Sequence, residues 1–238
     1  MIDYSALEIE LCDTLALRRR PVALIFGESI PSGIPKLEDT EPSGCSFWRI
    51  AAEGRTFYTI PGDHCNCAMG SYTLNYSLAQ DRAGELEQAF SRITSSGYVK
   101  MEEIPSIPRL KQSPNAVVYS PLGETPADPD LVIIVARPLQ AMILQEAAVR
   151  AGIGLRVSLF GRPTCMSLPD ALNQGMITSA GCLGNRVYTD LADDELYVLL
   201  PGRALRAVTN EVKAVAESNS RIADYHRARR ASLKTPPG

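Results

Sequence analysis

Four short apolar runs limit what this chain can fold into more than any other feature. Pro or Gly stands near several of their ends, and they span residues 22–26, 117–119, 131–135 and 196–200. Runs of this length bounded by such residues are typical of buried strands. Patterns typical of helices accompany them at about 5–20, 68–80, 83–95, 138–152 and 208–230. The sequence therefore predicts an α/β or α+β fold with a mixed sheet and flanking helices.

The domain organisation is predicted from the length of the chain and from a similarity between its two halves. A chain of 238 residues with 45% hydrophobic content can bury one sizeable core, so we expect a single domain over 1–238 with a flexible tail at 233–238. Each half, about 1–120 and 121–238, offers one cysteine in a loop after a strand region and one beside glycine, with Tyr-Thr just beyond. Two pseudo-symmetric halves would explain this similar arrangement of cysteines, and so would coincidence among common residues.

Composition narrows the class of protein. A net charge of -3 and a pI near 5.5 give no electrostatic reason to expect nucleic acid or an anionic membrane as partner. We find neither an apolar stretch of about 20 residues nor a secretory pattern at the start, and we expect a cytoplasmic protein. The six cysteines would then stay reduced, which leaves burial, catalysis or metal binding as their roles.

Cysteine and histidine are concentrated in one segment. Residues 62–70 place His64 between Asp63 and two thiols, Cys65 and Cys67. Thiolate and imidazole are ligands for zinc, copper and iron-sulfur clusters. The Cys-x-Cys spacing is too tight for a zinc ribbon. Cysteines that are far apart in sequence instead resemble the ligands of a cluster assembled from distant loops, and the set is Cys45, Cys67, Cys165 and Cys182.

These residues predict a 4Fe-4S protein with His64 as a neighbour or substitute ligand. Its role would be electron transfer, sensing or redox chemistry, with a redox partner protein or a small-molecule substrate. The sequence leaves open whether the protein is an enzyme and whether it forms a homo-oligomer. Candidate catalytic residues are His64 and Arg186, which lies four residues after Cys182. Weaker candidates for acid, base or anion-binding roles are Asp63, Glu53, Arg49 and Arg162.

Three other functions remain open at this stage. Cys67 or Cys182 could be a metal-free nucleophile that is activated by His64 or a helix end. A haem-like or corrin-like tetrapyrrole could bind with Cys or His as axial ligand, in a pocket lined by Phe47, Trp48 and Tyr72. A structural zinc site in an interaction module is the fourth reading.

The chain resembles a known family in several motifs. They are Arg20 to Ala23, Gly44 to Arg49, His64 to Thr73, Gly161 to Cys165 and Gly181 to Thr189. Together they are similar to the group called domain of unknown function 169, found in bacteria and archaea. The resemblance implies a cysteine site in which Cys67 is the ligand of the middle motif, whereas Cys65 stands where other residues are usual. It implies no reaction.

Overall fold

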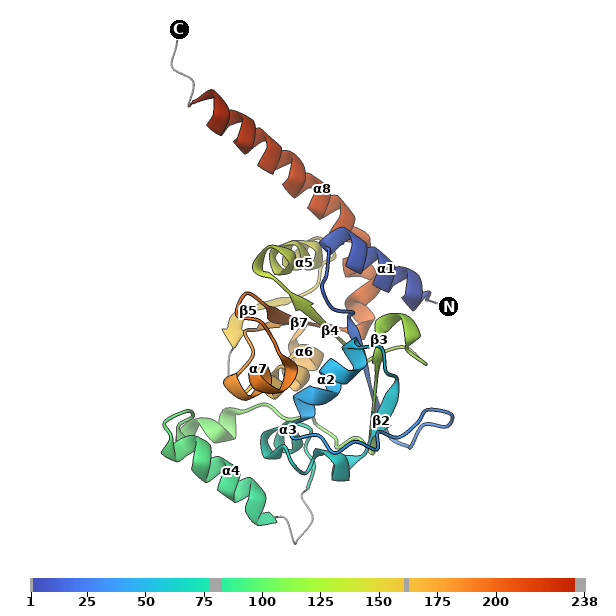
Figure 1. The fold of residues 1–238 in the computed structure, drawn as a ribbon, viewed down its shortest axis with the longest axis vertical. Coiled ribbons are helices and arrows are strands. Elements are labelled where there is room, and N and C mark those ends of the chain that lie inside the picture. The colour runs from blue at the N-terminus through green and yellow to red at the C-terminus, as the bar shows by residue number, and fades with distance from the viewer. Residues whose placement is uncertain (1, 78–82, 161–162, 234–238) are drawn as a thin grey trace.

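The computed structural model describes residues 2–77, 83–160 and 163–233. One seven-stranded mixed sheet runs through it in the order β2-β3-β1-β4-β7-β6-β5, with helices on both faces (Figure 1). The β5–β6 pair is parallel and the other neighbouring strands are antiparallel. The strands are β1 Val22–Gly27, β2 Phe57–Thr59, β3 Ala116–Pro121, β4 Leu131–Ala136, β5 Leu155–Phe160, β6 Met176–Ser179 and β7 Leu196–Pro201.

The helices flank this sheet on both faces. The α-helices are α1 Tyr4–Leu15, α2 Gly44–Ala52, α3 Ala68–Thr73, α4 Ala83–Ser95, α5 Pro138–Arg150, α6 Ser167–Gln174, α7 Leu183–Thr189 and α8 Gly202–Ser232. Short 3-10 helices are η1 Pro61–His64, η3 Met101–Ser106, η4 Leu122–Glu124 and η5 Thr164–Met166. The expected mixed sheet with flanking helices is confirmed. No described helix is long and apolar enough to cross a membrane.

Alternate residues of the central strands pack into two separate hydrophobic cores, one on each face of the sheet. On one face, Val132 and Ile134 of β4 pack with α1, α5 and α8 in an aliphatic cluster. On the other face, Leu131 and Ile133 pack with α2 and α6 in a cluster that also contains Phe47, Trp48, Tyr119 and Tyr197. This alternation follows from the two-residue period of a strand, which sends successive side chains to opposite faces.

Several predicted boundaries were wrong. The first helix ends at Leu15, because Ala16 adopts a left-handed conformation with φ 50°, so the arginines at 18–20 lie beyond the helix and not in its last turn. The second expected helix, 68–80, ends at Thr73 as α3, and Asn75 turns the chain with φ 63°. The last helix begins at Gly202, not near 208. A Cβ at position 202 would lie 1.6 Å from the carbonyl oxygen of Pro129, so glycine is required where α8 starts.

Both halves of the chain contribute to one continuous sheet. Strand β1 from the first half pairs on one side with β3 and on the other with β4, which comes from the second half. The division into two related halves stays a prediction. Of the expected flexible tail, 233–238, only Leu233 is described; residues 234–238 lie outside the described part.

Candidate functional site

Each of the four cysteines lies at the start of a helical segment. Cys45 is the second residue of α2, and Cys67 and Cys182 are the N-cap residues of α3 and α7. Cys165 lies in η5, which leads directly into α6. The expectation of a loop position was therefore wrong for Cys45 and Cys165, which stand in helical turns. Helix starts present free backbone N–H groups and the positive end of the helix dipole.

The helical segments that carry these cysteines pack against one another. Helix α2 contacts both α3 and α7, and α3 contacts η5. Figure 1 shows α2, α3, α6 and α7 gathered on one side of the sheet, away from α1, α5 and α8. The tertiary structure thus brings together four helix starts that are separated by up to 137 positions in the chain, from 45 to 182.

A hydroxyl just before the first cysteine of each half contacts the second cysteine of that half. In the first half, Ser43 Oγ accepts a hydrogen bond from the Cys45 backbone N–H at 3.3 Å and lies 3.8 Å from Cys67 Sγ. In the second half, Thr164 Oγ1 accepts a hydrogen bond from the Cys182 backbone N–H. Both pairs of cysteine-bearing turns are therefore joined locally by a small hydroxyl side chain.

Electrostatic interactions link the cysteines across the two halves. Burial raises the pKa of the Cys45 thiol, and charge repulsion from Cys67 and Cys182 raises it further. Burial also raises the pKa of Cys165, with repulsion from Cys67, Cys45 and Cys182 added. Because like charges shift a pKa strongly only at short range, the four sulfurs share one region of the structure.

Polar side chains from the opposite half partly offset these effects. Asn185 of α7 lowers the pKa of Cys45, and Thr73 of α3 lowers the pKa of Cys165, because both favour the thiolate. The amide atoms of Asn185 are buried and make no hydrogen bond with conventional geometry in the described part of the chain. Ser43, Thr164, Thr73 and Asn185 were not predicted as site residues, although Thr73, Thr164 and Asn185 lie inside the cysteine motifs.

The sulfurs are near one another without forming a tight ligand set. Within residues 2–77, 83–160 and 163–233, no group of three or more His, Cys, Asp or Glu side chains is arranged to hold a metal ion. A side chain at position 70 of α3 would crowd Cys67, since a Cβ there would lie 2.9 Å from Cys67 Sγ. The absence of a side chain at Gly70 leaves room for this sulfur.

His64 lies in the aromatic core beside the start of α2. Its ring centroid lies 4.9 Å from that of Phe47 and 5.2 Å from that of Tyr76, and its Nε2 lies 2.9 Å from Thr59 Oγ1. Its Nδ1 has no hydrogen-bond partner among the described residues, and a Cβ at Gly44 would lie 3.6 Å from it. Burial lowers the pKa of His64 to about 4, so the imidazole is neutral at pH 7.

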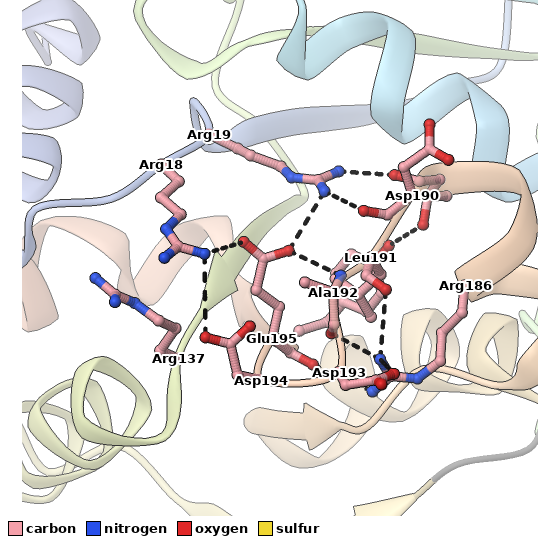
Figure 2. A network of polar contacts seen from close by, with 12 residues as sticks. Arg18, Arg19, Arg137, Arg186, Asp190, Leu191, Ala192, Asp193, Asp194 and Glu195 are labelled. Carbon is pink, nitrogen blue, oxygen red and sulfur yellow. Dashed lines mark hydrogen bonds and ion pairs between the residues drawn. The ribbon is translucent and has the colours of Figure 1, made fainter.

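Arg186 holds the chain around Cys182 in place. Figure 2 shows its guanidinium directed at the segment from Leu191 to Glu195. It donates hydrogen bonds to backbone carbonyls on both sides of α7, which belong to Ala180, Leu191, Ala192 and Glu195. These bonds occupy the donors that a substrate would need, so the position of Arg186 is that of a structural clamp.

The weaker polar candidates have local partners too. Asp63 accepts hydrogen bonds from Lys36 Nζ at 2.9 Å and from the Ile60 backbone N–H at 2.8 Å. Arg49 and Glu53 pair with each other at 2.9 Å on the surface of α2. Arg162 lies outside the described residues.

The rings expected to line a tetrapyrrole pocket pack against other aromatic side chains. Phe47 contacts Phe57 and Tyr119, and Trp48 contacts Tyr197 at a centroid distance of 5.4 Å. Tyr72 packs against Phe90, and the Arg109 guanidinium lies over its ring. These contacts give the rings roles in the core and at its edge.

Two other cysteines differ from the set of four. Cys65 is half-buried, and its thiol lies 3.9 Å from the Pro61 carbonyl oxygen. Cys12 lies in α1, on the aliphatic side of the sheet, and burial raises its pKa to about 11. The pKa shifts of Cys45 and Cys165 come mainly from burial and from the other cysteines of the set of four.

A cavity opens beside the Cys165 turn. Its volume is about 270 Å³, and one wall is formed by Pro163, which precedes η5, and Met166, which ends it. Tyr98 forms another wall, and its hydroxyl accepts a hydrogen bond from the Leu183 backbone N–H, directly after Cys182, at 3.3 Å. The remaining lining residues are Val99, Glu103, Ser106 and Ile107. The cavity therefore borders the segment that carries Cys165, and Tyr98 connects its wall to the residue after Cys182.

Comparisons with known proteins found a family model and a curated relative that are both uncharacterised. The model of DUF169, described as uncharacterised ArCR, matches residues 10–211. An uncharacterised protein of Methanocaldococcus jannaschii, MJ0308, is 24% identical over 196 residues, which cover 78% of this chain and 82% of that protein. No solved structure matches the chain.

Proposed function

The chain belongs to the DUF169 family, and we propose that Cys45, Cys67, Cys165 and Cys182 hold a 4Fe-4S cluster that serves electron transfer, sensing or redox chemistry on a small molecule. The observation that carries this proposal is the meeting of four cysteine-bearing helix starts, each from a different part of the chain. Four cysteine thiolates are the usual donor set of such a cluster.

Charge balance supports a metal centre at these thiols. Two of them, Cys45 and Cys165, are buried, and burial together with mutual repulsion keeps their thiols protonated. A bound metal centre would compensate the negative charge of the thiolates and displace their protons. The same effects disfavour Cys45 and Cys165 as free nucleophiles, because the thiolate is the reactive form.

A cluster and a single zinc ion place different demands on the thiols. A zinc ion needs its sulfurs about 2.3 Å from one common point, and no described group is arranged for a single metal ion. A cluster of several irons keeps its thiolates farther apart than one ion does. When bound, it would supply one-electron transfer.

The remaining residues of the site have positioning roles. Ser43 and Thr164 connect the cysteine-bearing turns, Asn185 and Thr73 favour the thiolate forms, and Arg186 fixes the turn that carries Cys182. Hydrogen bonds and polar groups near ligand sulfurs tune the affinity and potential of a cluster. His64 is neutral and already bonded to Thr59, so we assign it as a neighbour of the site and not as a ligand.

The test is metal and sulfide analysis of the chain purified without oxygen. We expect about four irons and four sulfides per chain and a broad visible absorption that bleaches on reduction. Serine at any of the four positions should lower iron content several-fold. Cys12→Ser and Cys65→Ser are the matched controls and should leave iron unchanged.

Three outcomes would contradict the proposal. Iron that is lost equally in Cys12→Ser would mean that the four cysteines are not a distinct set. One zinc per chain without iron would point to a structural zinc site. A chain without metal that one alkylation at Cys67 or Cys182 inactivates would point to a thiolate enzyme.

A further inference from the structure

The stretch that carries Cys182 is braced by its own hydrogen bonds. It runs from Ala180 to Glu195, contains α7, and is called the Cys182 segment below. Arg186 of α7 donates hydrogen bonds to the Ala180 carbonyl oxygen before the helix and to the Ala192 carbonyl oxygen after it, the latter at 2.7 Å. The Ala192 backbone N–H donates to the Glu195 carboxylate at 3.1 Å. Because these contacts connect both ends of the segment to its middle, we expect it to move as one unit.

One arginine from the first half of the chain ties this segment to the body of the protein. Arg19 lies between α1 and β1, and its guanidinium donates hydrogen bonds to the carbonyl oxygens of Thr189, at 2.7 Å, and Asp190. These carbonyls lie at the C-terminal end of α7, where backbone acceptors lack partners within the helix. Figure 2 shows the same guanidinium reaching the Glu195 carboxylate, which lies 3.3 Å away. Arg19 therefore holds the segment at the end of α7 and at its last residue.

Burial makes the pair of Arg19 and Glu195 costly to separate. The Glu195 side chain is only 4% exposed, and that of Arg19 is 24% exposed. A buried carboxylate that loses its cationic partner is left uncompensated, which costs far more than the loss of an exposed ion pair. The neighbouring Arg18 compensates less, because its side chain is 55% exposed and its guanidinium lies 3.9 Å from the carboxylate. Arg19 is therefore the cation on which the position of Glu195 mainly depends.

The opposite end of α7 carries Cys182. The backbone N–H of Cys182 donates to Thr164 Oγ1, and that of Leu183 donates to the Tyr98 hydroxyl at 3.3 Å. These neutral hydrogen bonds hold this end together with the packing of α7 against α2. Helix α7 has seven residues, so its two ends are only about 10 Å apart. A shift of the end that Arg19 holds would therefore be passed on to Cys182.

We propose that Arg19 is a positioning residue of the cysteine site, which acts through Glu195 and α7 on the place of Cys182. The left-handed Ala16 ends α1 and lets the chain bring Arg19 to α7. A metal ligand must stand within a few tenths of an ångström of its bonding position, so a loosened Cys182 segment should release a metal centre sooner. The inference rests on the proposed function for this metal effect alone, because the accessibility of a thiol can be measured without metal.

The first experiment measures how fast iodoacetamide alkylates each cysteine of the metal-free full chain, with the sites resolved by mass spectrometry. Arg19→Gln should raise the alkylation rate of Cys182 several-fold, because a loosened segment exposes its thiol. Cys65, which is half-buried outside the segment, should react at its wild-type rate. Arg18→Gln is the matched control, since it removes the adjacent arginine and leaves the bonds of Arg19 in place, and both rates should stay unchanged.

Two further variants separate positioning from a failure to fold. Adding Glu195→Gln to Arg19→Gln removes the uncompensated buried carboxylate and should return the Cys182 alkylation rate toward the wild-type value. Arg19→Lys keeps the charge but has fewer donors in a different geometry, so it should give a smaller increase than Arg19→Gln. Circular dichroism checks that each variant is folded, and Arg19→Lys decides the test where Arg19→Gln does not fold.

The second experiment measures the rate at which the iron-loaded chain releases iron to EDTA. Release should be several-fold faster in Arg19→Gln than in the wild type or Arg18→Gln. Cys182 alkylation at the wild-type rate in Arg19→Gln and in Arg19→Lys overturns the positioning role. Faster alkylation of Cys12, Cys65 and Cys182 alike also overturns it, since that is the result of a general loss of stability. A chain that holds no iron contradicts the cluster, and the alkylation rates then decide the positioning role by themselves.

Discussion

The two faces of the sheet differ in what they bury. The face covered by α1, α5 and α8 is filled with aliphatic side chains such as Leu144 and Val208, which are fully buried and need no polar partner. The opposite face, covered by α2, α3, α6 and α7, buries aromatic rings, two of the four cysteines and polar atoms without partners in the described chain, such as His64 Nδ1 and the Asn185 amide.

This difference indicates that one face of the sheet mainly stabilises the fold and the other carries the proposed site. Aliphatic packing stabilises the fold at no cost in unpaired polar groups. Buried polar atoms without partners reduce stability, and native proteins tolerate them where they serve a site. We therefore expect substitutions on the aliphatic face to change stability and substitutions on the cysteine face to change metal content. Three predictions, given from the largest expected change in the free energy of unfolding to the smallest, test this expectation.

Leu144→Ala should give the largest loss of stability. Leu144 of α5 is fully buried in the aliphatic cluster, and truncating such a leucine costs about 2–5 kcal/mol because it leaves a cavity. Urea denaturation measures the change. Iron per folded chain should stay at the wild-type value. A variant that loses iron in proportion to its stability would show that the two faces are not independent.

Acid should destabilise the cysteine face through His64. Its pKa is lowered from 6.5 to about 4 by burial, so between these pH values the unfolded chain binds a proton that the folded chain does not. The resulting stability is present above pH 6.5, is lost as the pH falls toward 4, and amounts to about 3 kcal/mol.

The measurement compares free energies of unfolding at pH 7 and pH 4.5 in the metal-free chain. His64→Asn should lose much less unfolding free energy between pH 7 and pH 4.5 than the wild type does. His226→Asn, at an exposed position in α8, should lose as much as the wild type. Equal acid sensitivity in the wild type and His64→Asn would mean that His64 is not neutral in the folded state.

Asn185→Leu should change stability least. The amide is buried without a conventional hydrogen-bond partner, so an apolar side chain of similar shape should alter the free energy of unfolding by no more than about 1 kcal/mol. Iron affinity should fall about 10–100-fold, because Asn185 favours the thiolate of Cys45.

Ser120→Ala is the matched control for this substitution. Ser120 on β3 is also buried without a partner among the described residues, and it pairs with Ala23 of the aliphatic cluster. Its substitution should leave both stability and iron affinity unchanged. Iron affinity that falls equally in both variants would argue against a special role for Asn185.

The sequence located the central strands because each is an uninterrupted apolar run. Strands β1, β3, β4 and β7 were predicted in this way, and their burial on both faces explains the missing polar alternation. Strands β2 and β6 were missed, since runs of three and four residues carry little periodicity. Strand β5, with Arg156 and Ser158 within it, has no such apolar run.

Helix ends were harder to predict than helices. Nothing in Ala16 indicates a left-handed residue, yet its conformation ends α1 and leaves Arg19 free to bond the carbonyls at the end of α7 and the buried Glu195. These partners lie 170 to 176 positions away, and local pattern carries no information about such contacts. Arg186 differs in this respect, because the carbonyls that it bonds on both sides of α7 lie only five to nine positions away.

By itself, the sequence determined the fold class, the order of most elements and the four cysteines as the residues to consider, because these depend on local composition and spacing. Only the tertiary structure decided that each cysteine starts a helical segment, that these segments pack together, and that Ser43, Thr164, Thr73 and Asn185 accompany the sulfurs. The reason is physical: sheet topology determines which distant segments share a buried volume, and burial and repulsion among the thiols act only once they do.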